Sequence, residues 1–195
     1  MIIAFLGESL KHYRECFLVL LEKLELRCPY CSSLTHWHAW YKRSVKGELL
    51  PLSILRVKCC GCSSTHAVLP DLLSPYKQYS QIVQEDALQQ VLEDGMGLEH
   101  VEFSAETEEA VQGPSVDTLR RWVRRHRQRC RHYLGALAAF LTRQGLAVGP
   151  WDEGFPGFRL LLSVAEAWAG QTLRGTSLFG KSNILLTIAQ PRLWI

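Results

Sequence analysis

Hydrophobic residues recur at every third or fourth position in several segments of the chain, and this spacing predicts amphipathic helices. The predicted helices span residues 9–26, 80–94, 104–112, 115–141 and 158–169. Ser9, Ser80 and Ser115 stand where a hydroxyl can accept a hydrogen bond from the first helical turn, so they are the expected N-caps. The apolar run 183–189 fits either a short strand or a short helix.

Extended structure is expected in the first third of the chain. Residues 35–43 are rich in aromatic side chains and residues 52–58 in aliphatic and β-branched ones, with Gly47 between them. This pattern predicts a β-hairpin. Residues 1–6 are expected to form a short strand. Residues 65–76 contain two prolines around a short apolar run, and we interpret them as a linker or docking turn between modules.

Two Cys-x-x-Cys motifs flank the predicted hairpin. The four cysteines are Cys28, Cys31, Cys59 and Cys62. Each motif can direct two sulfurs at one point, and two motifs supply the four thiolates of a tetrahedral structural Zn²⁺ site. A Cys-x-x-Cys turn, a β-hairpin and a second Cys-x-x-Cys turn together predict a zinc ribbon.

Other side chains could take the place of one of these cysteines. Cys60 could replace Cys59, although only Cys59 gives the two-residue gap to Cys62, and His36, His38 or His66 could substitute for a cysteine. A thioredoxin-like redox role is disfavoured because no βαβ setting surrounds either motif.

Charge is distributed unevenly. Residues 81–118 contain no Lys or Arg but ten acidic residues, whereas seven arginines follow within residues 120–131, and the predicted ribbon is basic as well. Such clustering suggests a polyanionic partner, although the arginines could equally pair with the acidic segment of their own chain. We expect both, with a basic surface left over.

The short helix 104–112, a turn at Gly113 and the capped basic helix match a helix-turn-helix motif, whose second helix lies in the major groove of DNA. The residues expected to contact DNA lie at the start of that helix and on the hairpin. They are Ser115, Thr118, Arg120, Arg121, Arg124, Arg125, Lys42 and Arg43. Trp122 is expected to pack on the preceding helix.

Composition limits the class of protein and its expected compartment. The chain has 195 residues, a net charge of +3 and 47% hydrophobic residues, enough for a buried core. No apolar run reaches the roughly 18 residues of a membrane span, and no signal peptide is evident. Seven cysteines without an export signal indicate a reducing cytoplasm.

No catalytic constellation is found. A two-metal nuclease needs three carboxylates on a sheet, and residues 145–195 offer Asp152, Glu153 and Glu166 in too short a segment. We therefore expect no enzyme and no small-molecule substrate. The tryptophan-rich tail is expected to cover the core or to meet a partner.

The segments Cys28-Pro29-Tyr30-Cys31, Lys58-Cys59-Cys60-Gly61-Cys62 and Leu69-Pro70-Asp71 resemble a bacterial zinc-ribbon family of unknown function that is related to N-terminal modules of transposases. The sequence Ser-Val-Asp-Thr-Leu-Arg-Arg-Trp at 115–122 is similar to recognition helices of transposase-type helix-turn-helix domains. The resemblance implies recognition of DNA, including the ends of a mobile element, with the four cysteines as zinc ligands.

We therefore expect an α+β, mostly α chain: a small β-hairpin zinc ribbon, then an all-α helix-turn-helix-like domain and a short helical tail. The expected parts are residues 1–26, 27–70, 76–145 and 146–195. The expected function is DNA binding with structural Zn²⁺. The alternative is a protein-interaction module that meets a partner protein or a second copy of the chain.

Overall fold

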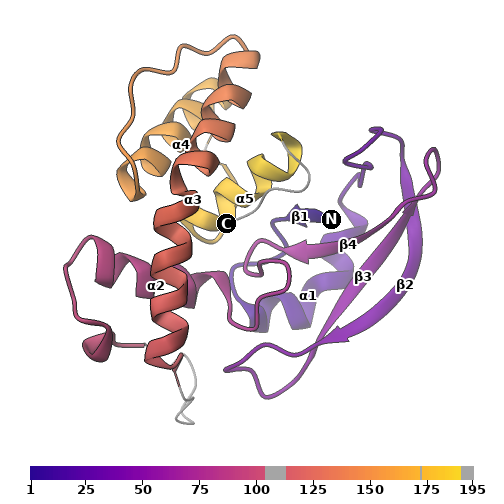
Figure 1. Ribbon diagram of the computed structural model, residues 1–195. Helices are drawn as coiled ribbons and strands as arrows, with labels where there is room; N and C mark the ends of the chain where they lie inside the picture. The colour runs from indigo at the N-terminus through magenta and orange to yellow at the C-terminus, as the bar shows by residue number, and fades with distance from the viewer. Residues whose placement is uncertain (104–112, 172, 190–195) are drawn as a thin grey trace.

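The computed structural model describes residues 1–103, 113–171 and 173–189. These residues form five α-helices and one four-stranded sheet (Figure 1). The strands are β1 (Ile2–Ala4), β2 (Thr35–Arg43), β3 (Leu52–Cys59) and β4 (Thr65–Pro70). The helices are α1 (Leu10–Glu22), α2 (Gln81–Leu92), α3 (Val116–Arg143), α4 (Phe155–Ala169) and α5 (Leu178–Ala189), with a single 3₁₀ turn η1 (Leu98–His100) after α2.

The predicted hairpin is confirmed. β2 and β3 pair antiparallel from Thr35↔Cys59 to Arg43↔Leu52, with a bulge between Trp37 and Ala39. Because Thr35 and Cys59 are opposite each other, the register brings the two Cys-x-x-Cys motifs to one end of the hairpin.

The interpretation of residues 65–76 as a linker or docking turn was wrong for Thr65–Pro70, which forms β4. This strand pairs antiparallel with β3 and parallel with β1, so the sheet order is β1-β4-β3-β2. Val68 and Leu69 are fully buried in the sheet. Pro70 is compatible with this position because it ends the strand, where a missing N–H interrupts little pairing. The sheet is therefore larger than a two-stranded ribbon.

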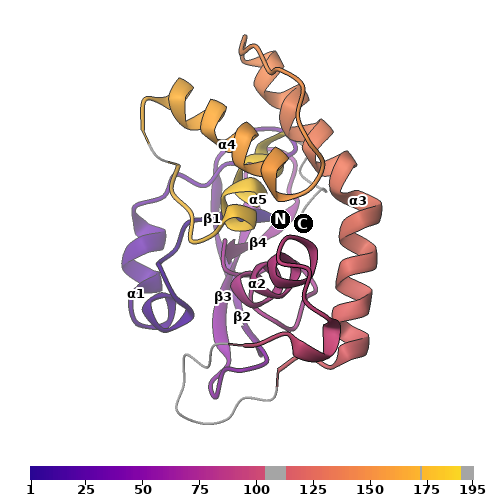
Figure 2. The same ribbon diagram turned by 90° about the vertical axis from the view of Figure 1, so that its left-hand side faces the viewer.

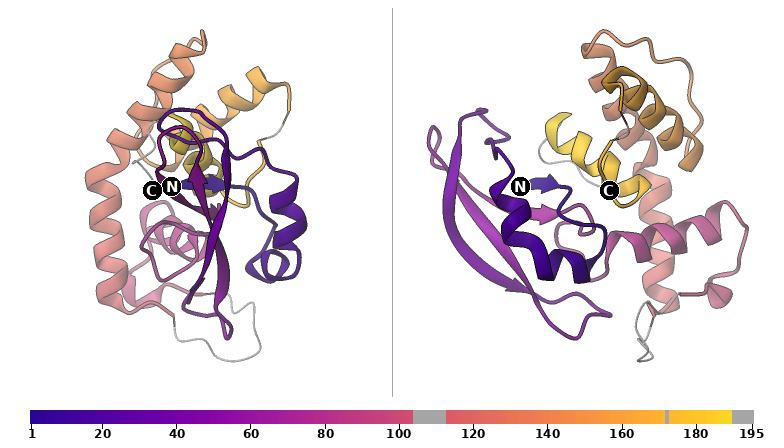
Figure 3. Two further views of the ribbon diagram at one scale, coloured as in Figure 1. Left: turned by 90° about the vertical axis from the view of Figure 1, so that its right-hand side faces the viewer. Right: turned by 180° about the vertical axis from the view of Figure 1, so that it is seen from behind.

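The sheet separates α1 from the other helices. α1 lies against one face, and α2 and α3 lie on the opposite side (Figure 2). Seen from behind, α1 comes to the front of the molecule (Figure 3, right). Leu10, Tyr13 and Leu21 of α1 are buried with sheet residues such as Ile54 and Val57 in one hydrophobic cluster.

A second hydrophobic cluster fills the space among α2, α3, α4 and α5. Two carboxylates connect α5 and the segment before it to earlier parts of the chain. Asp71, at the end of β4, accepts hydrogen bonds from the backbone N–H and the hydroxyl of Thr176, each at 2.6 Å. Glu85 of α2 accepts from the N–H groups of Leu178 and Phe179, which belong to the first turn of α5. Its charge satisfies donors that a helix start leaves unpaired.

The helix caps follow the sequence closely. Ser9, Ser80 and Ser115 each accept a hydrogen bond from the N–H three residues later. α1 ends at Glu22, earlier than predicted, and residues 178–189 form a helix rather than a strand. The helix predicted for 104–112 lies outside the described residues. Among those described, no helix has both the length and the apolar character needed to cross a membrane.

His126 of α3 gives the stability of this protein an expected pH dependence. Its ring packs against both Phe155 and Phe179, with each centroid 5.6 Å away and the two phenyl centroids 5.2 Å from each other, and neither ring nitrogen has a hydrogen-bond partner among the described residues. Burial lowers the pKa of His126 to about 4.

The unfolded chain, with a histidine pKa near 6.5, binds a proton that the folded chain excludes. The free energy of unfolding is therefore expected to fall by roughly 3 kcal/mol between pH 6.5 and pH 4. Urea unfolding across this range should show the fall, and His126→Phe should reduce it, whereas the exposed His132→Phe should not. An identical pH dependence in His126→Phe would contradict this assignment.

Candidate metal centre and basic surface

The sheet brings the four cysteines of the two motifs together. The Sγ atoms of Cys28, Cys31, Cys59 and Cys62 all lie within 4.8 Å of one another. Cys28 and Cys62 are 3.6 Å apart, and Cys31 and Cys59 are 3.4 Å apart. These separations exceed a disulfide bond of about 2.05 Å. They are close to the roughly 3.8 Å between sulfurs that surround a tetrahedral metal at 2.3 Å. The cluster can therefore hold a metal ion.

Each pair of cysteines is shaped by a tight turn of the same kind. Ser32 and Ser63, each four residues after the first cysteine of its motif, both have φ of 59°. The backbone N–H of Tyr30 donates to Cys28 Sγ at 3.4 Å, and that of Gly61 donates to Cys59 Sγ at 3.3 Å. Such bonds stabilise thiolates, which are the form of cysteine that binds metal.

A serine follows each motif and adds to this effect. Hydrogen bonds with the hydroxyl and then the backbone N–H of Ser33 lower the pKa of Cys31 to about 6. Ser64 lowers the pKa of Cys62 in the same two ways. The lowered pKa values of Cys31 and Cys62 favour their thiolates, which reduces the number of protons that metal binding must release.

The site has little spare room. A Cβ atom on Gly61 would lie 2.5 Å from Ser33 Oγ and 3.5 Å from Cys31 Sγ. The glycine in Cys-Cys-Gly-Cys therefore allows the second turn to approach the first.

The alternative ligands lie outside the four-sulfur cluster. Cys60 is exposed, with its Sγ 3.6 Å from His36 Nδ1, and His38 is exposed on β2. None of these three side chains belongs to the four-sulfur cluster. His66 is buried beside the cluster, with Nε2 3.3 Å from Cys28 Sγ. His66 therefore contacts the ligand Cys28 from outside the cluster, as second-layer partners of metal sites do.

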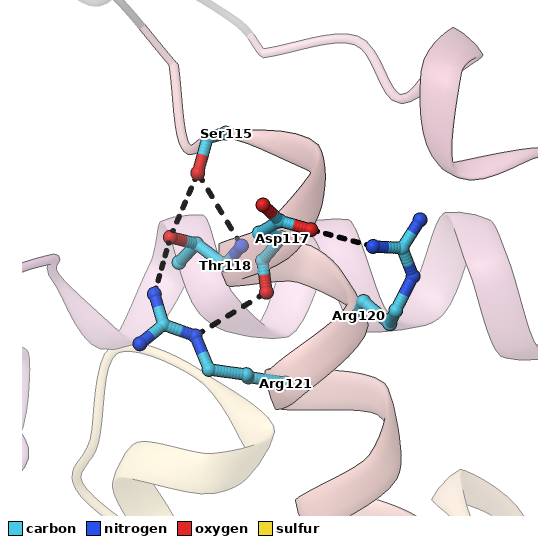
Figure 4. A network of polar contacts seen from close by, with 5 residues as sticks. All are labelled: Ser115, Asp117, Thr118, Arg120 and Arg121. Carbon is cyan, nitrogen blue, oxygen red and sulfur yellow. Dashed lines mark hydrogen bonds and ion pairs between the residues drawn. The ribbon is translucent and has the colours of Figure 1, made fainter.

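The basic half of α3 faces solvent. All seven arginines between 120 and 131 are exposed, whereas Leu119, Val123 and Cys130 on the opposite side of the helix are buried. At the start of the helix, Ser115 Oγ lies 3.1 Å from Thr118 Oγ1, which in turn accepts a hydrogen bond from Arg121 at 3.1 Å (Figure 4). Arg120 pairs with Asp117 at 2.5 Å.

The expected pairing between the acidic segment and these arginines is not found in the described residues. Glu93 pairs with Arg159 of α4, and Glu85 binds the start of α5. The helix α3 instead uses Asp117 for Arg120 and Glu153 for Arg131, the latter at 3.6 Å. Across the described part of the chain, Arg121, Arg124, Arg125, Arg127 and Arg129 form no ion pair, so this surface keeps a strong positive charge. Glu106, Glu108 and Glu109 lie outside the described residues.

The two hairpin residues differ in their surroundings. Lys42 is exposed and donates to Ser53 Oγ at 2.7 Å. Arg43 is half-buried and donates to the carbonyl oxygens of Ser74 and Lys77 at 2.6 and 2.7 Å. Arg43 therefore fixes the loop between β4 and α2.

That loop connects the hairpin to α3. The sequence analysis interpreted residues up to 76 as a linker or docking turn but did not predict these contacts. Lys46 N donates to the carbonyl of Gln78 at 2.7 Å, and the Tyr79 ring meets Trp122 of α3 edge to face at 5.3 Å. Burial, and after it the charges of Arg125 and Arg129, lower the pKa of Lys77 to about 8. Trp122 thus packs against Tyr79, which precedes α2 in the sequence. The only sequence signal for this loop was its tyrosines beside a lysine.

Residues 28–122 match the model of a family described as "Domain of unknown function (DUF6431)". The match begins at the first clustered cysteine and ends at Trp122, so it covers the metal cluster, three strands, α2 and the start of α3. The comparisons with curated proteins and with solved structures find no match. The family match and the cysteine cluster agree with the resemblance to a family of unknown function. The link to transposases stays a prediction.

Proposed function

We propose that this chain is a DNA-binding protein of the transposase-related type, with a structural Zn²⁺ held by the four clustered cysteines. The observation that carries the proposal is the row of exposed arginines on α3 without ion pairs among the described residues. Phosphates satisfy such a surface, because each contact releases condensed counterions. The helix-turn-helix expected from the sequence includes residues 104–112, which lie outside the described residues. In this proposal α3 is the recognition helix, with Ser115 and Thr118 nearest the base edges.

The thiolate set supports zinc rather than a harder cation, because four sulfurs in tetrahedral spacing suit Zn²⁺ and disfavour Mg²⁺ or Ca²⁺. The metal would act structurally. It would join the two cysteine turns, and the turns hold β2 and β3 in register. Through Lys46, Arg43 and the loop 74–79, the hairpin then positions α3.

A gel-shift selection from random duplex DNA, with zinc-loaded protein, tests this function. We expect binding at low salt that weakens about 10³-fold between 50 and 200 mM salt, as for about six phosphate contacts. Enrichment of one sequence would indicate base recognition by the start of α3. No duplex binding even at low salt would rule out the proposal.

A second candidate is a protein-interaction module. Trp37 and Trp40 of β2 meet edge to face at 5.7 Å, remain 45% and 42% exposed, and continue onto Phe17 of α1. An apolar patch of this kind suits a partner protein or a second copy of the chain. Sedimentation of the wild type and of a Trp37→Ser, Trp40→Ser variant would reveal a homodimer through a loss of mass in the variant only.

A further inference from the structure

The face of the sheet opposite α1 carries an open cleft of about 530 Å³ next to the cysteine cluster. Along β2, Tyr41 and Arg43 line this cleft, whereas Trp40, on the other face of the strand, packs on Phe17 of α1. Ala67 of β4 lies in the floor of the cleft and Tyr76 lines it from the loop 74–79. The cleft therefore lies on the face of the sheet away from α1. Figure 2 shows that α3 lies on that side of the sheet.

The chemistry of the cleft is aromatic and basic. It is lined by three tyrosines, Tyr30, Tyr41 and Tyr76, and by the arginines Arg43 and Arg56. The guanidinium of Arg56 lies over the Tyr41 ring, with Cζ 5.3 Å from the centroid. None of the described residues that line it carries a carboxylate. The site thus offers flat apolar faces beside positive charge.

Tyr76 is held in an unusual conformation at this site. Its φ is 60°, a backbone region that non-glycine residues rarely occupy, and it is 86% exposed. Arg43 fixes both flanks of this residue by binding the carbonyls of Ser74 and Lys77. Strained residues persist where surrounding structure enforces them, and they concentrate at binding sites.

We propose that this cleft binds an unpaired nucleotide, with its base stacked on a tyrosine ring and its phosphate bonded by Arg56. Tyrosines beside arginines on a sheet face are how proteins commonly hold single-stranded nucleic acid. The volume also lies in the range of small-ligand sites. An acidic peptide would satisfy the arginines but would make little use of three ring faces.

The proposal rests on the proposed DNA-binding function and extends it. Lys77 follows Tyr76 directly and lies within electrostatic reach of Arg125 and Arg129 on α3. The loop 74–79 therefore contributes Tyr76 to the cleft, and its Tyr79 packs against Trp122 of α3. A strand that separates from a duplex bound at α3 could pass along Lys77 into the cleft. The protein would then bind a junction between paired and unpaired DNA.

The test compares labelled single-stranded oligothymidylate with a fully paired duplex by fluorescence anisotropy, using the full-length, zinc-loaded chain. The variants are Arg56→Ala and Tyr76→Gly, and the control is Lys11→Ala, an exposed lysine on α1 at the other face. Glycine adopts positive φ without strain, so Tyr76→Gly should keep the loop. Each cleft variant is expected to weaken single-strand binding about tenfold or more. Duplex binding and the Lys11→Ala control should not change.

The outcomes separate this inference from the proposed function. Single-strand affinity that is equal in wild type, Arg56→Ala and Tyr76→Gly would overturn the cleft assignment even if the duplex binds. A glutamate-rich peptide that loses affinity in the same variants while the oligonucleotide does not would assign the cleft to acidic peptides, and so overturn it too. Loss of single-strand binding in the variants, with no duplex binding in the wild type, would keep the cleft and remove the proposed function of α3.

Discussion

Cys59→Ser is expected to abolish metal binding and to unfold the cysteine-bearing end of the hairpin. Cys59 is 2% exposed, and its Sγ accepts hydrogen bonds from the N–H groups of Gly61 and Cys62, so it is central to the cluster. Structural zinc sites contribute on the order of 10 kcal/mol of folding free energy in small domains. Elemental analysis should fall from about one metal ion per chain to near zero, and thermal unfolding should occur at lower temperature.

Cys60→Ser is the matched control for this substitution. It makes the same chemical change one residue away, at an exposed thiol outside the four-sulfur cluster. We expect full metal content and an unchanged unfolding temperature. If the two serine variants retain equal metal, Cys59 is not a ligand and the geometry of the cluster has been misinterpreted. If Cys60→Ser alone loses the metal, Cys60 is the ligand.

The combined variant Arg121→Ala, Arg124→Ala, Arg125→Ala is expected to lose most duplex affinity at low salt. All three side chains are exposed on α3 and form no ion pair among the described residues, so their removal should cost binding without unfolding the helix. Each phosphate contact contributes about 0.9 to the slope of log affinity against log salt. The slope should therefore fall by about 3, which a salt titration of binding measures directly.

Arg124→Ala and Arg143→Ala form a matched pair that tests where on α3 the DNA lies. Both arginines are exposed on the same helix and lack an ion pair among the described residues, but they lie about 28 Å apart along its axis. Arg124→Ala should reduce the salt slope by about 1, and Arg143→Ala should leave it unchanged. Equal effects at both positions would indicate a non-specific attraction to the whole molecule instead of a defined contact surface.

Local signals explain which parts of the fold could be predicted. The caps Ser9, Ser80 and Ser115 act within one helical turn, and a Cys-x-x-Cys turn directs its sulfurs through its own backbone. Both features can therefore be predicted from residues that are adjacent in the sequence. The hairpin was equally accessible because β2 and β3 are close in sequence. The proximity of the Cys31 and Cys59 sulfurs follows from the pairing register of β2 and β3.

Long-range pairing explains what was missed. β4 was mistaken for a linker because Pro70 suggested a break, which hid its local pairing with β3, and because its other partner β1 is only three residues long and lies more than sixty residues earlier. Glu93 and Glu85 were expected to face α3, but their partners Arg159 and the start of α5 come from the last part of the chain. Arg43 was likewise expected at the surface, because its hydrogen bond to the Ser74 carbonyl joins residues that are far apart in the sequence.

X-ray absorption at the zinc edge of the purified chain tests the central claim most directly, because it reports the ligands of the bound metal without any substitution. We predict four sulfur neighbours at about 2.3 Å and no nitrogen. A protein that holds no zinc after expression in zinc-supplied cells would contradict the account. So would a spectrum with histidine nitrogen in the first shell at about 2.0 Å, since His36, His38 or His66 would then replace a cysteine.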